Sequence, residues 1–240
     1  GMNENYSWNS EYSAATLTIL SVSIGFAVYW FLAMNKKLKS LFFKKYSSEN
    51  AWTAYVLFQK MMGVLFMGTI PCIVLISNSD YTLADVGLNL KNYKESLLYI
   101  LAAGTFILFV NFFVSKNKTN LAMYPEMRVK EWNIKTIILN SIGWAAYILS
   151  YELMFRGLLL MVCYQTFGFW PAVAINLSFY SSTHIAKGLT ETVGSFPFGL
   201  FLCYATVSTG SIAVAFVTHL ILALSNDYYS VYHNPEMKYV

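Results

Sequence analysis

The chain has 240 residues, of which 57% are hydrophobic and 12% charged, and its formal net charge is +4. A water-soluble domain carries about 25% charged residues, so this composition and the mean hydropathy of +0.48 exclude an ordinary soluble globule. Several apolar runs approach the roughly 20 residues that cross a bilayer. We therefore predict an all-α, polytopic transmembrane helical bundle with about seven to eight membrane helices.

The apolar runs predict seven spans in chain order. Gly168, Gly188 and Gly210 are turn signals between the later spans. The last three runs are short, which is compatible with tilted helices or a locally thinner bilayer. The predicted spans are Ala14–Met34, Trp52–Ser77, Ser96–Ser115, Ile134–Gln165, Pro171–Ala186, Glu191–Ser208 and Ser211–Ser225.

We expect one integral membrane domain with four parts. Residues 1–13 form an N-terminal tail, in which Gly1 before the methionine is typical of an expression-tag scar. Residues 14–131 hold the first membrane helices and their loops, and residues 132–226 hold the helices with polar motifs. Residues 227–240 form a C-terminal tail. The acidic N-terminus lacks a basic n-region, so we predict no cleavable signal peptide.

The lysines concentrate in two loops, which indicates membrane topology rather than nucleic-acid binding. These loops carry Lys36, Lys37, Lys39, Lys44 and Lys45 after the first span, and Lys116, Lys118, Arg128 and Lys130 after the third. The positive-inside rule places both loops in the cytoplasm, with the N-terminus outside and the C-terminus cytoplasmic. Usage rich in Lys, Asn and Tyr is typical of a low-GC bacterium, so we expect a bacterial inner (cytoplasmic) membrane.

Four ionisable side chains lie inside the apolar runs of the second half: Glu152, Arg156, His184 and His219. Such groups are expensive in a bilayer and persist where they pair, face the bundle interior or do chemistry. Glu152 and Arg156 are four residues apart and can pair on one helix face. The pair is either a structural ion pair or one part of a site that includes the two imidazoles.

A carboxylate and two imidazoles around one water can form a hydrolytic centre. The same groups, Glu152, His184 and His219, can also hold Zn²⁺ with an open position. The chain lacks the HExxH spacing, so we expect no cofactor and keep zinc as the alternative. Asn176 and Asn226 lie eight and seven residues from the two histidines, where they can orient a substrate amide or form interhelical hydrogen bonds.

Three motifs of the second half resemble those of the CPBP family, which comprises type II CAAX prenyl endopeptidases and bacteriocin-processing or immunity membrane proteins. The family motifs are Glu-Glu-x-x-x-Arg, Phe-x-x-x-His and His-x-x-x-Asn on successive membrane helices. The resemblance covers about residues 132–226. In this chain the motifs read Tyr151-Glu152-x-x-x-Arg156, Tyr180-x-x-x-His184 and His219-x-x-x-Ala223.

Two positions depart from the family pattern. The first Glu of the family, thought to activate water together with the His of the second motif, is Tyr151 here. The Asn thought to help form an oxyanion pocket is Ala223 here. Tyr is a poor general base because its unperturbed pKa is near 10, although its hydroxyl can donate a hydrogen bond.

The resemblance implies an intramembrane endopeptidase that cleaves lipidated or membrane-associated peptides with water activated by Glu152 and His184. His219 would then stabilise the oxyanion and Arg156 would hold Glu152. Tyr151 is also a catalytic candidate. We place Tyr180, Asn176 and Asn226 in a substrate or oxyanion pocket.

The alternative is a catalytically degenerate member that acts as a binding protein, an immunity factor, a chaperone or a complex subunit. A small proton-coupled carrier is a third possibility, which the lack of an inverted repeat disfavours. The expected partners are membrane lipid and a membrane-associated or lipidated peptide, with no nucleic acid.

Overall fold

The computed structural model describes residues 6–240, and Gly1 lies outside the described residues. The larger helices are α1 (Ser13–Ala33), α3 (Ser48–Gly63), α4 (Ile70–Ser77), α5 (Tyr93–Val114), α7 (Ile134–Glu152), α8 (Met161–Phe167), α9 (Phe169–His184), α10 (Leu189–Thr209) and α11 (Ala213–His233). The shorter elements are the 3₁₀ turns η1 (Ser10–Tyr12) and η4 (Ile185–Lys187), the helices α2 (Lys36–Lys45) and α6 (Lys118–Met123), and the parallel strands β1 (Glu131–Trp132) and β2 (Lys238–Tyr239). The all-α expectation is confirmed.

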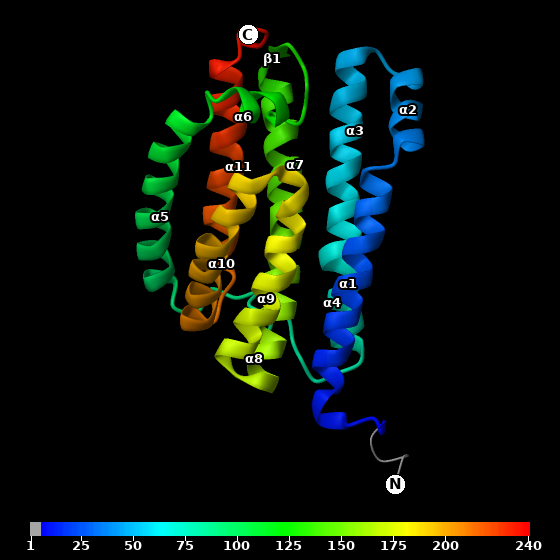
Figure 1. Ribbon diagram of the computed structural model, residues 1–240, viewed down its shortest axis with the longest axis vertical. Coiled ribbons are helices and arrows are strands. Elements are labelled where there is room, and N and C mark those ends of the chain that lie inside the picture. Colours follow the sequence, from blue (N-terminus) through cyan, green and yellow to red (C-terminus); the bar gives the residue numbers. More distant parts are fainter. Residues whose placement is uncertain (1–5) are drawn as a thin grey trace.

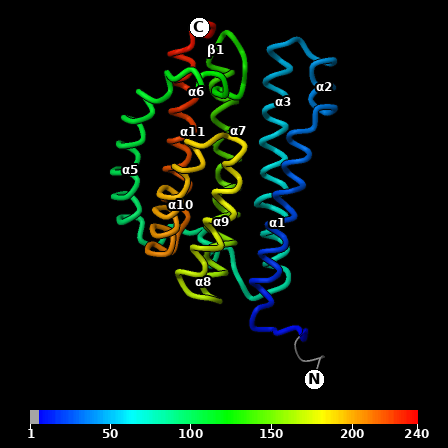
Figure 2. Tube along the Cα trace, viewed as in Figure 1, coloured from blue at the N-terminus to red at the C-terminus, as the bar shows by residue number. Residues whose placement is uncertain are grey.

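The long helices run side by side along one axis (Figure 1). In this view α1 and α3 form one flank and α5 the other, with α7, α9, α10 and α11 between them. The helix α11 packs against α5, α7 and α10, and α7 packs against α3. The trace in Figure 2 shows that the turn from α9 to α10 lies well short of the end at which α7 begins. The residues of this turn therefore lie inside the length of the bundle.

Four helical stretches among residues 6–240 are long and apolar enough to cross a membrane: Ser10–Ala33, Ser48–Ser77, Tyr93–Val114 and Ile134–Phe167. The predicted count of seven to eight spans is therefore not confirmed, although helices cover all seven predicted stretches. The helix α9 has 16 residues, and α10 and α11 have 21 residues each. The helices α10 and α11 carry polar residues such as Thr206 and Thr218, which lower the mean hydropathy of these helices. Both threonines are buried in the bundle interior.

Glycines end three of the later elements at the predicted turns. Gly168, Gly188 and Gly210 have φ angles of 84°, 100° and 70°. Residues with a Cβ disfavour this region, and glycine adopts it without strain. The chain can therefore reverse sharply between α8, α9, α10 and α11, which brings the motif helices together.

Two π-helical segments interrupt the longest helices. The segment η2 (Val64–Thr69) joins α3 to α4, and η3 (Leu153–Leu160) joins α7 to α8. The wider π turn shifts the backbone hydrogen bonds, and the Ser150 hydroxyl donates to the Val64 carbonyl at 3.0 Å. A Cβ at Gly68 would overlap the Ser150 side chain. Close packing of η2 on α7 therefore fixes the backbone just before Glu152.

The packing of η2 on α7 gives a first prediction. Gly68→Ala should lower the thermal unfolding midpoint of the detergent-solubilised protein, because overpacking costs about 1–3 kcal/mol. Gly194→Ala is the matched control, since a Cβ at this position of α10 meets nothing within 4 Å. Alanine at Gly194 should leave the midpoint unchanged or raise it. A Gly68→Ala protein that melts at or above the native midpoint would contradict the packing described.

Candidate functional site

Glu152 and Arg156 form a fully buried ion pair. Glu152 is the last residue of α7, and Arg156 lies in η3. The Arg156 Nη1 donates to Oε2 of Glu152 at 3.1 Å and to Oε1 at 3.3 Å. Both side chains are 0% exposed. A charge buried to this degree is tolerated only when it is paired and hydrogen-bonded, so each residue neutralises the other.

His219 of α11 is the second partner of Glu152. Its Nδ1 lies 2.5 Å from Oε1 of Glu152, and its side chain is 14% exposed. An ionised carboxylate only accepts hydrogen bonds, so Nδ1 carries the proton and donates it. In the neutral imidazole this leaves Nε2 as an acceptor. Three helical segments therefore meet at one carboxylate.

His184 lies at the end of α9, close to this cluster but not bonded to its carboxylate. Its Nδ1 donates to the Tyr180 carbonyl at 2.7 Å, which again leaves Nε2 as the acceptor. Within the described chain no hydrogen bond joins His184 to Glu152 or His219. The link runs through Thr183, whose Oγ1 lies 3.3 Å from His184 Nδ1.

Tyr151 stands between the two histidines. Its hydroxyl lies 3.2 Å from Oγ1 of Thr183, and its ring packs edge-on against His219 with the centroids 5.3 Å apart. The Tyr180 ring lies under the Arg156 guanidinium, 4.0 Å from Cζ. The predicted residues therefore lie in one layer of the bundle. The carboxylate, the guanidinium and His219 are in direct contact there, and His184 joins them through Tyr151 and Thr183.

The two asparagines take different places. Asn176 is fully buried and donates to the Phe155 carbonyl at 2.6 Å, while the Cys203 Sγ donates to its Oδ1 at 3.2 Å. It thus braces α9 against η3 and α10. Asn226 is partly exposed on α11, and its side chain makes no hydrogen bond to another described residue. The structure does not bring either amide into hydrogen-bond contact with Glu152, His184 or His219.

The geometry gives no support to the zinc alternative. No three His, Cys, Asp or Glu residues within 6–240 are arranged to hold a metal ion. The Glu152 oxygens already face the Arg156 cation and the protonated Nδ1 of His219. A divalent cation at this carboxylate would lie beside that guanidinium and be repelled by it.

Sequence reasoning missed one buried carboxylate. Asp227 is 0% exposed on α11, where its Oδ2 accepts from Trp144 Nε1 at 2.6 Å and from Asn140 Nδ2 at 3.0 Å. Asp227 lies two residues beyond the predicted end of the last span. The feature that could have revealed it is an acidic residue among the mostly apolar residues of this helix. Thr183 was also missed, and its only signal was its place next to His184.

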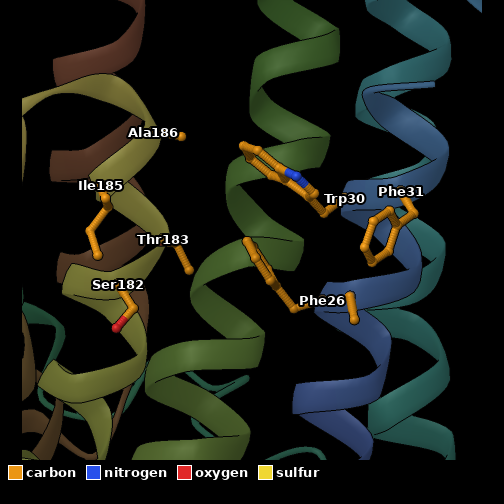
Figure 3. Close-up of a pocket in the computed structure, with 8 residues that line it drawn as sticks. Phe26, Trp30, Phe31, Ser182, Thr183, Ile185 and Ala186 are labelled. Atoms are coloured by element: carbon orange, nitrogen blue, oxygen red, sulfur yellow. The ribbon is translucent and has the colours of Figure 1, made fainter. Parts of the chain in front are cut away.

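A groove adjoins this layer of the bundle. It has a volume of about 430 Å³ and lies between α1 and the end of α9 (Figure 3). Thr183 both lines the groove and touches Tyr151, so the groove ends beside the site. Its lining consists of Phe26, Ala27, Trp30, Phe31, Ser182, Thr183, Ile185 and Ala186.

The comparisons with known proteins point to the same region. The family model described as Type II CAAX prenyl endopeptidase Rce1-like matches residues 147–225. This stretch contains all three motif positions, and the match supports membership of the CPBP family. No curated protein and no solved structure matches the chain.

The buried pair gives a second prediction. Arg156→Met should lower the free energy of unfolding by about 3–5 kcal/mol, because it leaves a buried carboxylate without its main partner. The double variant Glu152→Gln/Arg156→Met should recover most of the loss, since the Gln carbonyl can still accept from His219. Thermal unfolding of the three proteins in one detergent measures this. A double variant that unfolds at or below the midpoint of Arg156→Met would show that the two charges do not stabilise each other.

Proposed function

We propose that this chain, an integral membrane protein of the CPBP family, binds a membrane-associated or lipidated peptide without hydrolysing it. The main support is the state of the one carboxylate in the motif layer. Glu152 is fully buried and engaged by Arg156 and His219. A general base for water must come within hydrogen-bond reach of that water, and a side chain enclosed by two cationic or protonated partners is poorly placed for this.

The position of the family's water-activating carboxylate supports the same proposal. Tyr151 occupies it, and its hydroxyl is engaged by Thr183. A neutral phenol can donate a hydrogen bond to a ligand carbonyl, but it cannot take a proton from water near neutral pH. Ala223 has no amide to stabilise an oxyanion. The part of the motif that organises the site is thus retained, and the groups that would drive hydrolysis are replaced.

The groove between α1 and α9 supports a ligand of mixed character. Aromatic side chains of α1 line one wall, and Ser182 and Thr183 are the polar residues of the other wall. An apolar chain in the groove would place an attached peptide near Tyr151 and the free Nε2 atoms of the histidines. These groups can donate to or accept from a peptide bond, which suits binding.

The charge distribution supports a bacterial inner-membrane orientation with the C-terminus in the cytoplasm. The helices α2 and α6 and the C-terminus lie at the same end of the bundle (Figure 1), so both lysine-rich loops fall on one side. Under the positive-inside rule this side faces the cytoplasm, and the start of α1 faces outward.

One observation favours hydrolysis as a second candidate. The contact with Glu152 holds Nδ1 of His219 protonated and leaves Nε2 free. In known hydrolases a carboxylate orients a histidine base by the same kind of contact. In this case His219 would activate water, and Glu152 would only position it.

A gain-of-function test separates the two candidates. The native protein should leave lipidated peptides intact in detergent or vesicles. Tyr151→Glu combined with Ala223→Asn should create cleavage at least about 10²-fold above background, because a positioned base contributes 10²–10⁴-fold. Mass spectrometry of the peptide products measures the rate.

Two controls make the result specific. Tyr151→Phe keeps the ring and supplies no base, so this variant should show no cleavage. Adding His184→Ala to the gain-of-function variant should remove the new cleavage. Turnover by the native protein that His219→Ala abolishes would instead establish the histidine-based hydrolase.

A further inference from the structure

The segment between α6 and α7 folds back into the end of the bundle. Met127 and Trp132 are fully buried there, in a cluster with Val56 of α3 and Val231 of α11. The strand pair β1 and β2 ties the same segment to the C-terminal residues. These apolar and backbone contacts anchor residues 127–132 firmly.

The residues just before this anchor make polar contacts with the helices, and Tyr124 and Pro125 are also buried. Glu126 pairs with Lys60 of α3 at 2.7 Å, and their side chains are 31% and 6% exposed. The Lys60 ammonium also lies 3.2 Å from the centroid of the Trp144 ring, an attractive cation–π arrangement. A lysine buried in a membrane-crossing helix thus depends for its counter-charge on a carboxylate from a loop.

Tyr124 makes the second polar attachment. Its hydroxyl accepts from Lys187 Nζ at 3.1 Å and donates to Glu191 Oε1 at 3.4 Å. Burial raises the pKa of the Tyr124 phenol to about 12, so it remains a neutral bridge. Lys187 lies three residues after His184, so this attachment covers the end of α9 that carries the motif histidine.

Glu126 is electrostatically suited to this place. Partial burial opposes its ionisation, but the ammonium groups of Lys60 and Lys187 outweigh that effect and hold the pKa of the carboxyl below its ordinary value. The loop carboxylate therefore stays charged near neutral pH and can bridge the α3 side and the α9 side of the bundle.

A line of ring contacts connects these attachments with the motif layer. Lys60 Nζ lies 4.8 Å from the centroid of the Tyr147 ring. The Tyr147 ring lies 6.0 Å from that of Tyr151, which packs on His219. The loop residues are therefore linked to the motif layer along two routes. One runs through Lys60 to Tyr147, and the other runs through Lys187 to the turn that follows His184.

We propose that residues 124–126, here called the strap, close the motif layer at this end of the bundle, and that separation of Glu126 from Lys60 opens it. The strap would thus control access to the motif layer from this end of the bundle, an inference that rests on the proposed binding function. The apolar anchor at residues 127–132 would stay in place during opening. Opening would exchange the polar attachments for water and expose Tyr124 and Pro125, which is less apolar surface than the anchor buries.

Cysteine labelling tests the strap without any ligand. Ala223→Cys places a thiol one turn after His219 on the same helix face, and the native Cys72, Cys163 and Cys203 are buried. A small water-soluble maleimide is added to the detergent-solubilised protein, and mass spectrometry follows the label at position 223. Glu126→Gln should raise the labelling rate about tenfold or more. A tenfold rise corresponds to a loss of about 1.4 kcal/mol in the free energy that favours the closed strap.

The chain supplies a matched control on the same segment. Glu131 forms an exposed ion pair with Lys238 at 3.0 Å, and such surface pairs contribute little. Glu131→Gln should therefore leave the labelling rate unchanged. Lys60→Met/Glu126→Leu replaces the charged pair by apolar side chains and should label as slowly as the parent.

The outcomes separate this proposal from the binding function. Equal labelling of the parent and a folded Glu126→Gln protein would overturn the strap, and so would equal acceleration by Glu131→Gln. If Glu126→Gln does not fold, Tyr124→Phe replaces it, and a rate unchanged by this loss of the Lys187 and Glu191 contacts would also overturn the proposal. Because labelling requires neither peptide nor turnover, its failure leaves the proposed binding function untouched.

Discussion

The arrangement of the motif helices depends on one buried carboxylate. Glu152 lies where α7 passes into η3, and its oxygens contact Arg156 in the same segment and His219 on α11. Removing water from these groups is costly, and only their mutual hydrogen bonds offset that cost. The ion pair within one segment and the bond to a second helix therefore fix the distance between α7 and α11. The same contacts that organise the layer keep its carboxylate away from water.

Much of the helical architecture could be predicted from apolar run length and glycine turns. The fourth predicted span, Ile134–Gln165, corresponds to α7, η3 and α8, which run from Ile134 to Phe167. The π-helical segments could not be predicted, because the local sequence carries no signal for them; η2 instead packs on α7, far along the chain. The count of seven to eight spans stays a prediction, because α9, α10 and α11 carry polar residues and only four stretches of residues 6–240 are long and apolar enough to cross a membrane.

The site shows the same division between local and long-range information. Spacing alone predicted the Glu152–Arg156 pair, since residues four apart share a helix face. The position of His184 and His219 inside apolar runs marked both histidines as site candidates, but it did not predict their unequal relation to the carboxylate. The pair of Lys60 with Glu126 joins residues 66 apart through a loop without periodic pattern, so no sequence rule available here could find it.

Binding without hydrolysis is tested most directly by one measurement on the native protein. The purified protein is incubated with a library of lipidated peptides, and both the retained and the released peptides are identified by mass spectrometry. The account predicts that specific peptides are retained at full length and that no shortened products accumulate. Shortened products that disappear with Glu152→Ala or His184→Ala would contradict it.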